Sequence, residues 1–258
     1  MANNFDKAAK QYDATFTYSE IGKAQRERVY HFLRHEINDK STLNILELNC
    51  GTGEDAIYLS NLGHQIIATD ISSKMIAEAK AKNSTIQFKQ QDITTISSET
   101  FSEKFDLIFS NFGGLNCLNK KQLKTFIDIS ETLLQPNGKL IFVIMPKNCV
   151  WERFYFFIKG EFKKIYRRKS KQSVDANIDG VNVPTWYFNP SELKVLANKK
   201  YTLKLLKPIG ISIPPSYLEP FFSSKKRFLN VLINIEKWLS SSFWSKYADH
   251  YIISFQKK

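Results

Sequence analysis

The chain has 258 residues, 43% of them hydrophobic and 24% charged, a balance typical of a folded domain rather than of a disordered or membrane-embedded chain. Its three cysteines, Cys50, Cys117 and Cys149, form no C-x-x-C pair, which argues against a disulfide framework or a zinc site. Since no apolar leader and no run of membrane-spanning length is apparent, we expect a cytoplasmic protein. The net charge of +12 leaves a nucleic acid or a membrane surface open as a partner.

The first 40 residues predict helices that precede any strand. Phe5, Ala8 and Tyr12 keep helical spacing, and Ser19 is a candidate N-cap for a longer helix that ends near residue 38. Such helices can fold over the mouth of a neighbouring site.

The stretch from Ile45 to Asp70 predicts a strand, a glycine turn, a short helix, a second strand and a terminal acid. In such a unit the glycines let the backbone approach a ligand, and the helix N-terminus directs free N–H groups at it. An acid at the tip of the second strand is placed to accept hydrogen bonds from a ribose diol. The stretch therefore indicates a cofactor that contains a nucleoside.

The glycines alone do not choose between cofactors. Gly51-x-Gly53-x-x-Ala56, followed by Asp70, satisfies the loose dinucleotide pattern, so an NAD(P)-dependent oxidoreductase fits this part of the chain.

The residues around the glycines carry a more specific resemblance. The run 47–53, ELNCGTG, resembles the first motif, E-x-G-C-G-T-G, of the class I S-adenosylmethionine-dependent methyltransferases. The departure is Asn49, where the family usually has glycine, and Asn is the non-glycine residue that best tolerates a positive φ. The run 134–142, LQPNGKLIF, resembles the family's junction between a helix and the fifth strand. A dehydrogenase has no reason to show that junction.

The resemblance assigns functional residues along the core. The opening F-D-x-x-A-x-x-Y-D resembles methyltransferases related to quinone biosynthesis, in which the tyrosine lies beside the amino-acid end of the cofactor. Asp70 would hold the ribose, Met75 would lie near adenine, and Asp92 with Ile93 would clamp the base. The cofactor residues implied are Tyr12, Glu47, Asn49, Cys50, Gly51, Gly53, Asp70, Ile71, Met75, Asp92, Ile93, Asn111 and Phe112.

Between residues 146 and 190 the alternation of helix and strand breaks down, and aromatic residues are interleaved with Lys and Arg from 159 to 171. We favour a cap over the substrate, with Trp151, Tyr155 and Phe112 as substrate contacts. A helix on a membrane surface and an RNA-binding patch are the alternatives. The absence of an N-P-P-Y pattern counts against nucleic-acid substrates. A second aromatic insertion is expected at 211–246.

We therefore expect one α/β domain over 1–258, with a Rossmann-like, doubly wound, seven-stranded sheet whose last strand is antiparallel. Its parts would be lid helices (1–40), a cofactor core (41–145), a cap (146–190) and the remaining core (191–258). The resemblance implies methyl transfer from S-adenosyl-L-methionine, yielding S-adenosyl-L-homocysteine, to a small hydrophobic acceptor such as a quinone, phenol, polyketide or lipid-like metabolite. His250 is the weak candidate for a general base, and no metal is expected.

Overall fold

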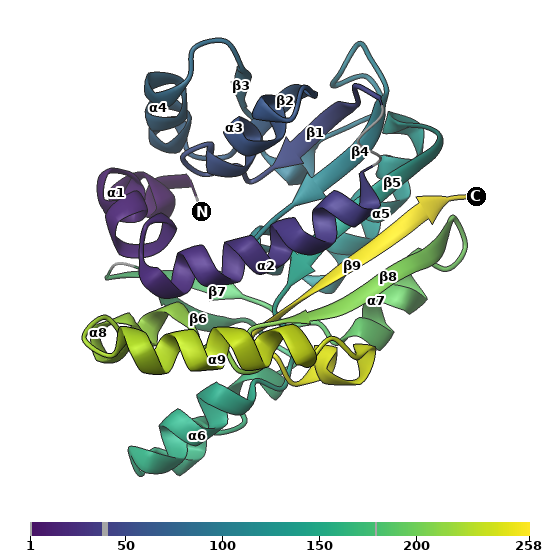
Figure 1. The fold of residues 1–258 in the computed structure, drawn as a ribbon. Helices are drawn as coiled ribbons and strands as arrows, with labels where there is room; N and C mark the ends of the chain where they lie inside the picture. Colours follow the sequence, from purple (N-terminus) through teal and green to yellow (C-terminus); the bar gives the residue numbers. More distant parts are fainter. Residues whose placement is uncertain (1, 38–40, 179) are drawn as a thin grey trace.

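The computed structural model describes residues 2–37, 41–178 and 180–258, so parts of the expected lid (1 and 38–40) and cap (179) lie outside the described residues. A seven-stranded sheet runs through the molecule in the order β3-β2-β1-β4-β5-β9-β8 (Figure 1). β9 is antiparallel to both neighbours, whereas the pairs from β3 to β5 are parallel. The expected doubly wound sheet is confirmed. Its strands are β1 (Asn44–Leu48), β2 (Gln65–Asp70), β3 (Gln87–Gln90), β4 (Phe105–Ser110), β5 (Leu134–Ile144), β8 (Tyr201–Ile209) and β9 (His250–Lys257).

Helices cover both faces of the sheet because successive strand residues point to opposite sides. Ile45 packs in a core with α2 (Glu20–Glu36), α3 (Glu54–Asn61) and α4 (Ser73–Lys82). Its neighbour Leu46 packs in a second core with α5 (Lys120–Leu133) and α7 (Pro190–Ala197). The three-layer arrangement brings the loops after β1, β2 and β4 to one edge.

The helix starts follow local capping chemistry. The side chains of Ser19, Ser72 and Asn119 accept hydrogen bonds from the backbone N–H groups of Gly22, Met75 and Gln122. α1 (Ala2–Tyr12) precedes Ser19 and continues into a short π-helical turn, Asp13–Thr17. These caps satisfy donors that the first helical turn leaves free.

β5 begins earlier than the sequence suggested. The run Pro136-Asn137-Gly138, whose composition is typical of a turn, lies within the strand, because Leu134 already pairs with Phe105 before the register shifts. The intervening residues form a bulge, with Asn137 at φ 63°. The backbone therefore still turns locally at Asn137, but the strand pairing continues on both sides of this turn.

The first insertion is less helical than its aromatic pattern indicated. α6 (Val150–Ile158) is followed by 3-10 turns at 162–164 and 167–169, and then by the antiparallel hairpin of β6 (Val174–Ile178) and β7 (Val181–Thr185). The hairpin was not expected from the sequence. Alternating Val174, Ala176 and Ile178 before an Asp-Gly pair is the signal that predicts it.

The second insertion packs against the first. It contains α8 (Glu219–Phe222), α9 (Lys226–Trp238) and a 3-10 turn, Ser242–Lys246. The Trp151 and Phe222 rings meet edge to face at 6.0 Å, and α6, α8 and α9 lie together at the bottom of Figure 1. In the described part of the chain no helix combines the length and apolar character needed to cross a bilayer.

Candidate active site

A cavity of about 530 Å³ opens at the edge where β1, β2, β4 and β5 end. One part is lined by the glycine loop, the ends of β2 and β4 and the helix α1. The other part is lined by both insertions and the start of β9. We call these parts the cofactor side and the acceptor side.

The glycine loop after β1 requires left-handed backbone conformations. Asn49, Gly51 and Gly53 have φ values of 47°, 54° and 81°. A Cβ atom on Gly53 would lie 2.9 Å from both Ala79 and the Phe88 ring, so only glycine fits there. The positive φ expected at Asn49 is present.

Asn49 also links two loops of the site. Its Nδ2 donates to the backbone oxygen of Asn111 at 3.0 Å, and its Oδ1 accepts from the Ser110 hydroxyl at 2.6 Å. A glycine at this position would offer neither bond. The departure from the family motif therefore fastens the loop after β4 to the loop after β1.

Asp70 lies at the tip of β2 and faces the cavity. Its Oδ2 accepts from the Gly51 backbone N–H at 2.9 Å, and its Oδ1 accepts from that of Ser72 at 2.8 Å. Burial raises the pKa of Asp70, while these backbone bonds oppose the rise. Each oxygen keeps a further lone pair that can accept a hydroxyl.

A second acid lies on the cofactor side. Asp92 uses Oδ1 to accept from the backbone N–H and the hydroxyl of Thr94, both at 2.8 Å, and this fixes the turn that carries Ile93. Both residues line the cavity, as do Ile71 and Met75. This part offers a carboxylate beside aliphatic and thioether surface, which suits a purine ring.

The helix α1 is fastened over this side by polar contacts. Asp6 accepts from the Ser72 hydroxyl at 2.5 Å and from the Lys74 backbone N–H at 3.2 Å. Asp13 accepts from the Thr52 hydroxyl at 2.6 Å. Tyr12 lines the cavity, and burial raises its pKa, so its phenol stays protonated.

Two buried charged groups beside this loop lack hydrogen-bond partners among the described residues. They are Glu47, through Oε2, and Arg26, through Nε and Nη1. Arg26 Nε lies 3.2 Å from Asp55 Oδ1, and its guanidinium lies 5.1 Å from the Phe112 ring centre. Burial raises the pKa of Glu47 well above its ordinary value, with Asp55 adding to the rise and Arg26 opposing it. Arg26 thus keeps an ion pair with Asp55, while its Nη1 and the Glu47 Oε2 are unsatisfied polar atoms buried beside the glycine loop.

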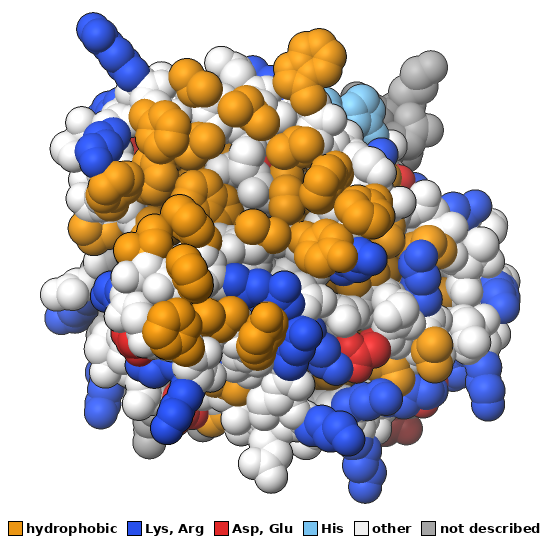
Figure 2. Space-filling model, turned by 90° about the horizontal axis from the view of Figure 1, so that it is seen from below, with side chains coloured by type: hydrophobic (Ala, Val, Ile, Leu, Met, Phe, Trp, Pro, Cys, Tyr) orange, Lys and Arg blue, Asp and Glu red, His pale blue; other side chains and the backbone are white. Residues whose placement is uncertain are grey.

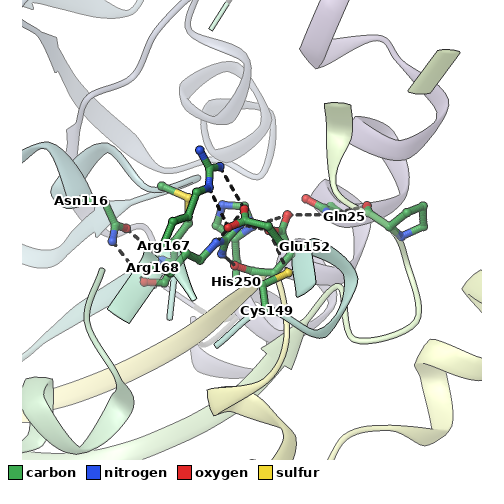
Figure 3. A network of polar contacts seen from close by, with 10 residues as sticks. Gln25, Asn116, Cys149, Glu152, Arg167, Arg168 and His250 are labelled. Carbon is green, nitrogen blue, oxygen red and sulfur yellow. Dashed lines mark hydrogen bonds and ion pairs between the residues drawn. The ribbon is translucent and has the colours of Figure 1, made fainter. Parts of the chain in front are cut away.

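The acceptor side is built on a buried ion-pair network (Figure 3). The Glu152 carboxylate binds Arg167 in a bidentate fashion, at 2.9 and 3.1 Å, and accepts from Arg168 Nε at 3.0 Å. Arg168 also donates to Asp249 Oδ1 at 2.9 Å. Burial alone would raise the pKa of Glu152, but Arg168 and Arg167 hold it below its ordinary value. The network ties the first insertion to the start of β9.

His250 lies at the end of this network and lines the cavity. Its Nδ1 is 3.2 Å from Asp249 Oδ2, an ion-pair contact without hydrogen-bond geometry. Its ring meets that of Phe112 edge to face at 5.6 Å. Although burial would raise the pKa of Asp249, His250 and Arg168 hold it below its ordinary value. Asp249 therefore stays ionised beside His250 Nδ1.

The structure separates the sequence-predicted residues into two groups. Those that line the cavity are Tyr12, Asn49, Gly51, Asp70, Ile71, Met75, Asp92, Ile93, Asn111, Phe112 and His250. Glu47, Cys50 and Gly53 shape the loop without lining the cavity. Trp151 and Tyr155 also lie outside the lining, because Trp151 packs into a small core with Ile21 and Tyr155 packs behind Tyr217. The functional roles remain predictions.

Sequence reasoning missed Arg26 and the pair Arg167 and Arg168. Arg26 falls on the buried side of α2, in line with Val29, Tyr30 and Leu33. A charge at a core position was a signal for a site residue. The two arginines were hidden within a basic run whose lysines are exposed.

The comparisons agree with this geometry. A family model described as a methyltransferase domain matches residues 45–138. An uncharacterized protein of Methanocaldococcus jannaschii is 29% identical over 84% of this chain and 81% of its own. A malonyl-[acyl-carrier protein] O-methyltransferase of Ilyobacter polytropus is 26% identical over 86% and 84%. The solved complex of DhpI with SAM and HEP has a TM-score of 0.63 at 17% identity, over 99% of this chain and 95% of DhpI, a likeness that shows the fold.

The methyltransferase-domain match over 45–138, the O-methyltransferase relatives and the fold together support the class I S-adenosylmethionine-dependent methyltransferase family. The chain is an enzyme whose methyl donor is S-adenosyl-L-methionine, so the oxidoreductase alternative is removed. The residues present fit that cofactor. Asp70 can hold a ribose, and Asp92 and Ile93 can hold a base.

Proposed function

We propose that the chain transfers the methyl group to an oxygen atom of a small acceptor with an apolar body, such as a phenol, a quinol or a fatty or polyketide acid. The carrying observation is the composition of the acceptor side. Tyr187 and Tyr217 line this side together with Arg167 and His250, and Phe112, whose ring meets that of His250, lines the same cavity. The O-methyltransferase activity in the name of the Ilyobacter relative supports oxygen as the receiving atom.

The chemistry asks little of side chains beyond orientation and exclusion of water. The bound cofactor supplies an electrophilic methyl group that the acceptor oxygen takes by in-line displacement. The aromatic walls hold the acceptor body, and the cap keeps water out. Arg167 keeps its Nη1 without a protein partner among the described residues, so it can bind an acidic oxygen.

His250 serves acceptors that carry a neutral hydroxyl. With Nδ1 beside Asp249, Nε2 is the nitrogen that can take the hydroxyl proton as the oxygen bonds to methyl and the methyl–sulfur bond of the donor breaks. The resulting imidazolium is stabilised by the ionised Asp249. An acceptor that is already a carboxylate needs no base, so the contribution of His250 depends on the acceptor.

The test is a product assay with deuterated S-adenosylmethionine and a panel of alkyl-substituted phenols, fatty acids and amines. Mass spectrometry reports which acceptor gains the labelled methyl group, and hydrolysis distinguishes an ester from an ether. We expect methyl ethers or esters and no methylated amines. Labelled amines alone, or no product from an acceptor with an apolar body, would overturn the proposal.

The variant His250→Asn separates the two oxygen chemistries. With a phenol we expect a fall of about 10²–10⁴-fold in kcat at neutral pH, partly recovered at higher pH where the phenol ionises by itself. With a fatty acid we expect little change. Titration with S-adenosylhomocysteine should give the wild-type affinity, which shows that the cofactor side is intact.

A further inference from the structure

The helix α9 has two apolar faces, although one suffices to pack it against the protein. Leu229, Leu232 and Ile233 face inward and join the small core under the insertions. Phe228, Val231, Ile235 and Trp238 follow at helical spacing on the outer side, where Trp238 is 89% exposed. An apolar outer face on a surface helix costs solubility and calls for a partner.

The helix α6 repeats this arrangement. Phe156 points inward, whereas Phe154, Phe157 and Ile158 are 56%, 60% and 66% exposed. The two helices belong to one surface, because Trp151 and Phe228 both pack on the Phe222 ring. Figure 2, which views the molecule from below, shows apolar side chains gathered over this side with Lys and Arg among and around them. We call the surface formed by α6, α8 and α9 the lower face.

The charges of this region have one predominant sign. Residues 150–172 and 219–246 contain 13 Lys and Arg but four Glu, so they carry most of the net charge of +12. Glu152 and Glu236 are buried, and Glu219 binds the backbone N–H groups of Glu20 and Ile21. Few carboxylates therefore remain at the surface to balance the lysines.

Several of these lysines lie over aromatic rings of the same region. Lys225 Nζ is 3.4 Å from the Phe221 ring centre, and Lys159 Nζ is 4.6 Å from that of Tyr155. Lys246 Nζ lies 4.9 Å from both Phe243 and Tyr247. Aromatic rings with ammonium groups over them suit the boundary between lipid chains and headgroups.

We propose that the lower face binds the surface of a bilayer that contains anionic lipids. The exposed Phe, Ile and Trp side chains enter the headgroup region, and the lysines contact the lipid phosphates and carboxylates. A second copy of the chain is a poorer occupant, because two such faces would bring two sets of lysines together.

The cavity lies close to this face. Tyr217 lines the acceptor side and is 42% exposed, and its ring packs 5.2 Å from that of Tyr155 on α6. An acceptor dissolved in the bilayer would therefore meet the cavity wall without crossing bulk water. Binding to the bilayer rests on the lower face alone and stands even if the acceptor is of another class.

The test is flotation of the purified 258-residue chain with vesicles of equal parts phosphatidylcholine and phosphatidylserine, against vesicles of phosphatidylcholine alone. We expect strong binding to the mixed vesicles that falls with added salt. Two double variants separate the apolar contribution to binding from the electrostatic one. The first combines Phe228→Ser with Trp238→Ser, and the second combines Lys159→Gln with Lys163→Gln. Each should lower the partition coefficient by on the order of tenfold or more.

Matched controls change exposed residues elsewhere. They are Val195→Ser on α7 and Lys120→Gln with Lys121→Gln on α5, and we expect wild-type flotation. All variants should bind S-adenosylhomocysteine as the wild type does, which shows that they fold. No flotation with either vesicle would overturn the proposal. The proposal would also be overturned if the wild-type chain formed a dimer that Trp238→Ser dissociates. Binding of RNA in competition with the vesicles would overturn it as well.

Discussion

At the scale of single residues, the cofactor side depends on groups that hold both the backbone and a ligand. Asp70 accepts one backbone N–H on each oxygen and keeps lone pairs towards the cavity. Asn49 replaces the glycine of the family motif and bridges two loops. Both side chains thus fix the conformation of the loops, and the Asp70 carboxylate oxygens can still accept hydrogen bonds from a ligand.

We expect Asp70→Ala to lose at least about a hundredfold in affinity for S-adenosylhomocysteine, because two hydrogen bonds to a charged group are removed. Calorimetric titration measures the affinity, with NADH as the negative control. Asp106→Ala is the matched control, since its carboxylate also accepts one backbone N–H, from Asn44, at the other end of the strands. Wild-type affinity in Asp70→Ala would place the ribose elsewhere.

At the scale of elements, the helix α1 closes the cofactor side. Ala8 and Ala9 pack on Met75, and Asp6 binds the N-terminal turn of α4. An acid at the start of a helix also gains from the helix dipole. These contacts hold α1 over the cofactor side.

We expect Asp6→Ala to weaken this contact, lowering the affinity for S-adenosylhomocysteine by about tenfold. Amide hydrogen exchange in α1 should become faster, since α1 would open more often. The neighbouring exposed Lys7→Ala is the control. If exchange in α1 stays slow and the affinity is unchanged, α1 is held by its apolar contacts alone.

At the scale of the whole molecule, the buried ion pairs link stability to pH. Glu152 and Asp249 have folded-state pKa values below their unfolded values because of Arg168, Arg167 and His250. Their contribution to stability is therefore present above the unfolded pKa, near 4, and is lost as the pH falls through the folded pKa. The network fastens the cap to β9, so acid should loosen the cap.

We expect Glu152→Gln to lower the free energy of unfolding by roughly 3 kcal/mol at neutral pH, because the arginines lose a buried partner. The difference from wild type should shrink as the pH falls below about 4, where the wild-type carboxyl begins to protonate. Urea denaturation of both proteins from neutral pH to below pH about 4 measures this difference in the free energy of unfolding. Glu161→Gln, at an exposed pair with Lys164, should match wild type throughout, and a pH-independent difference for Glu152→Gln would refute the linkage.

The sequence by itself determined the sheet, the glycine loop and the acids at strand ends. Those features depend on residues close together in the chain, namely nearly continuous apolar runs in strands buried on both faces, the positive φ tolerated by Asn and Gly, and short capping motifs. The helix starts at Ser19, Ser72 and Asn119 belong to the same class.

Only the tertiary structure decided how the charges pair and which apolar residues stay outside. Arg168 and Asp249 are 81 positions apart, and no local pattern relates them. Within one basic run, Arg167 and Arg168 turn inward while the lysines stay in water, because packing of the insertions creates buried carboxylates for the arginines alone. The sequence of α9 likewise places apolar residues on two faces of the helix, and only the tertiary structure decides which of the two the protein covers and which stays exposed.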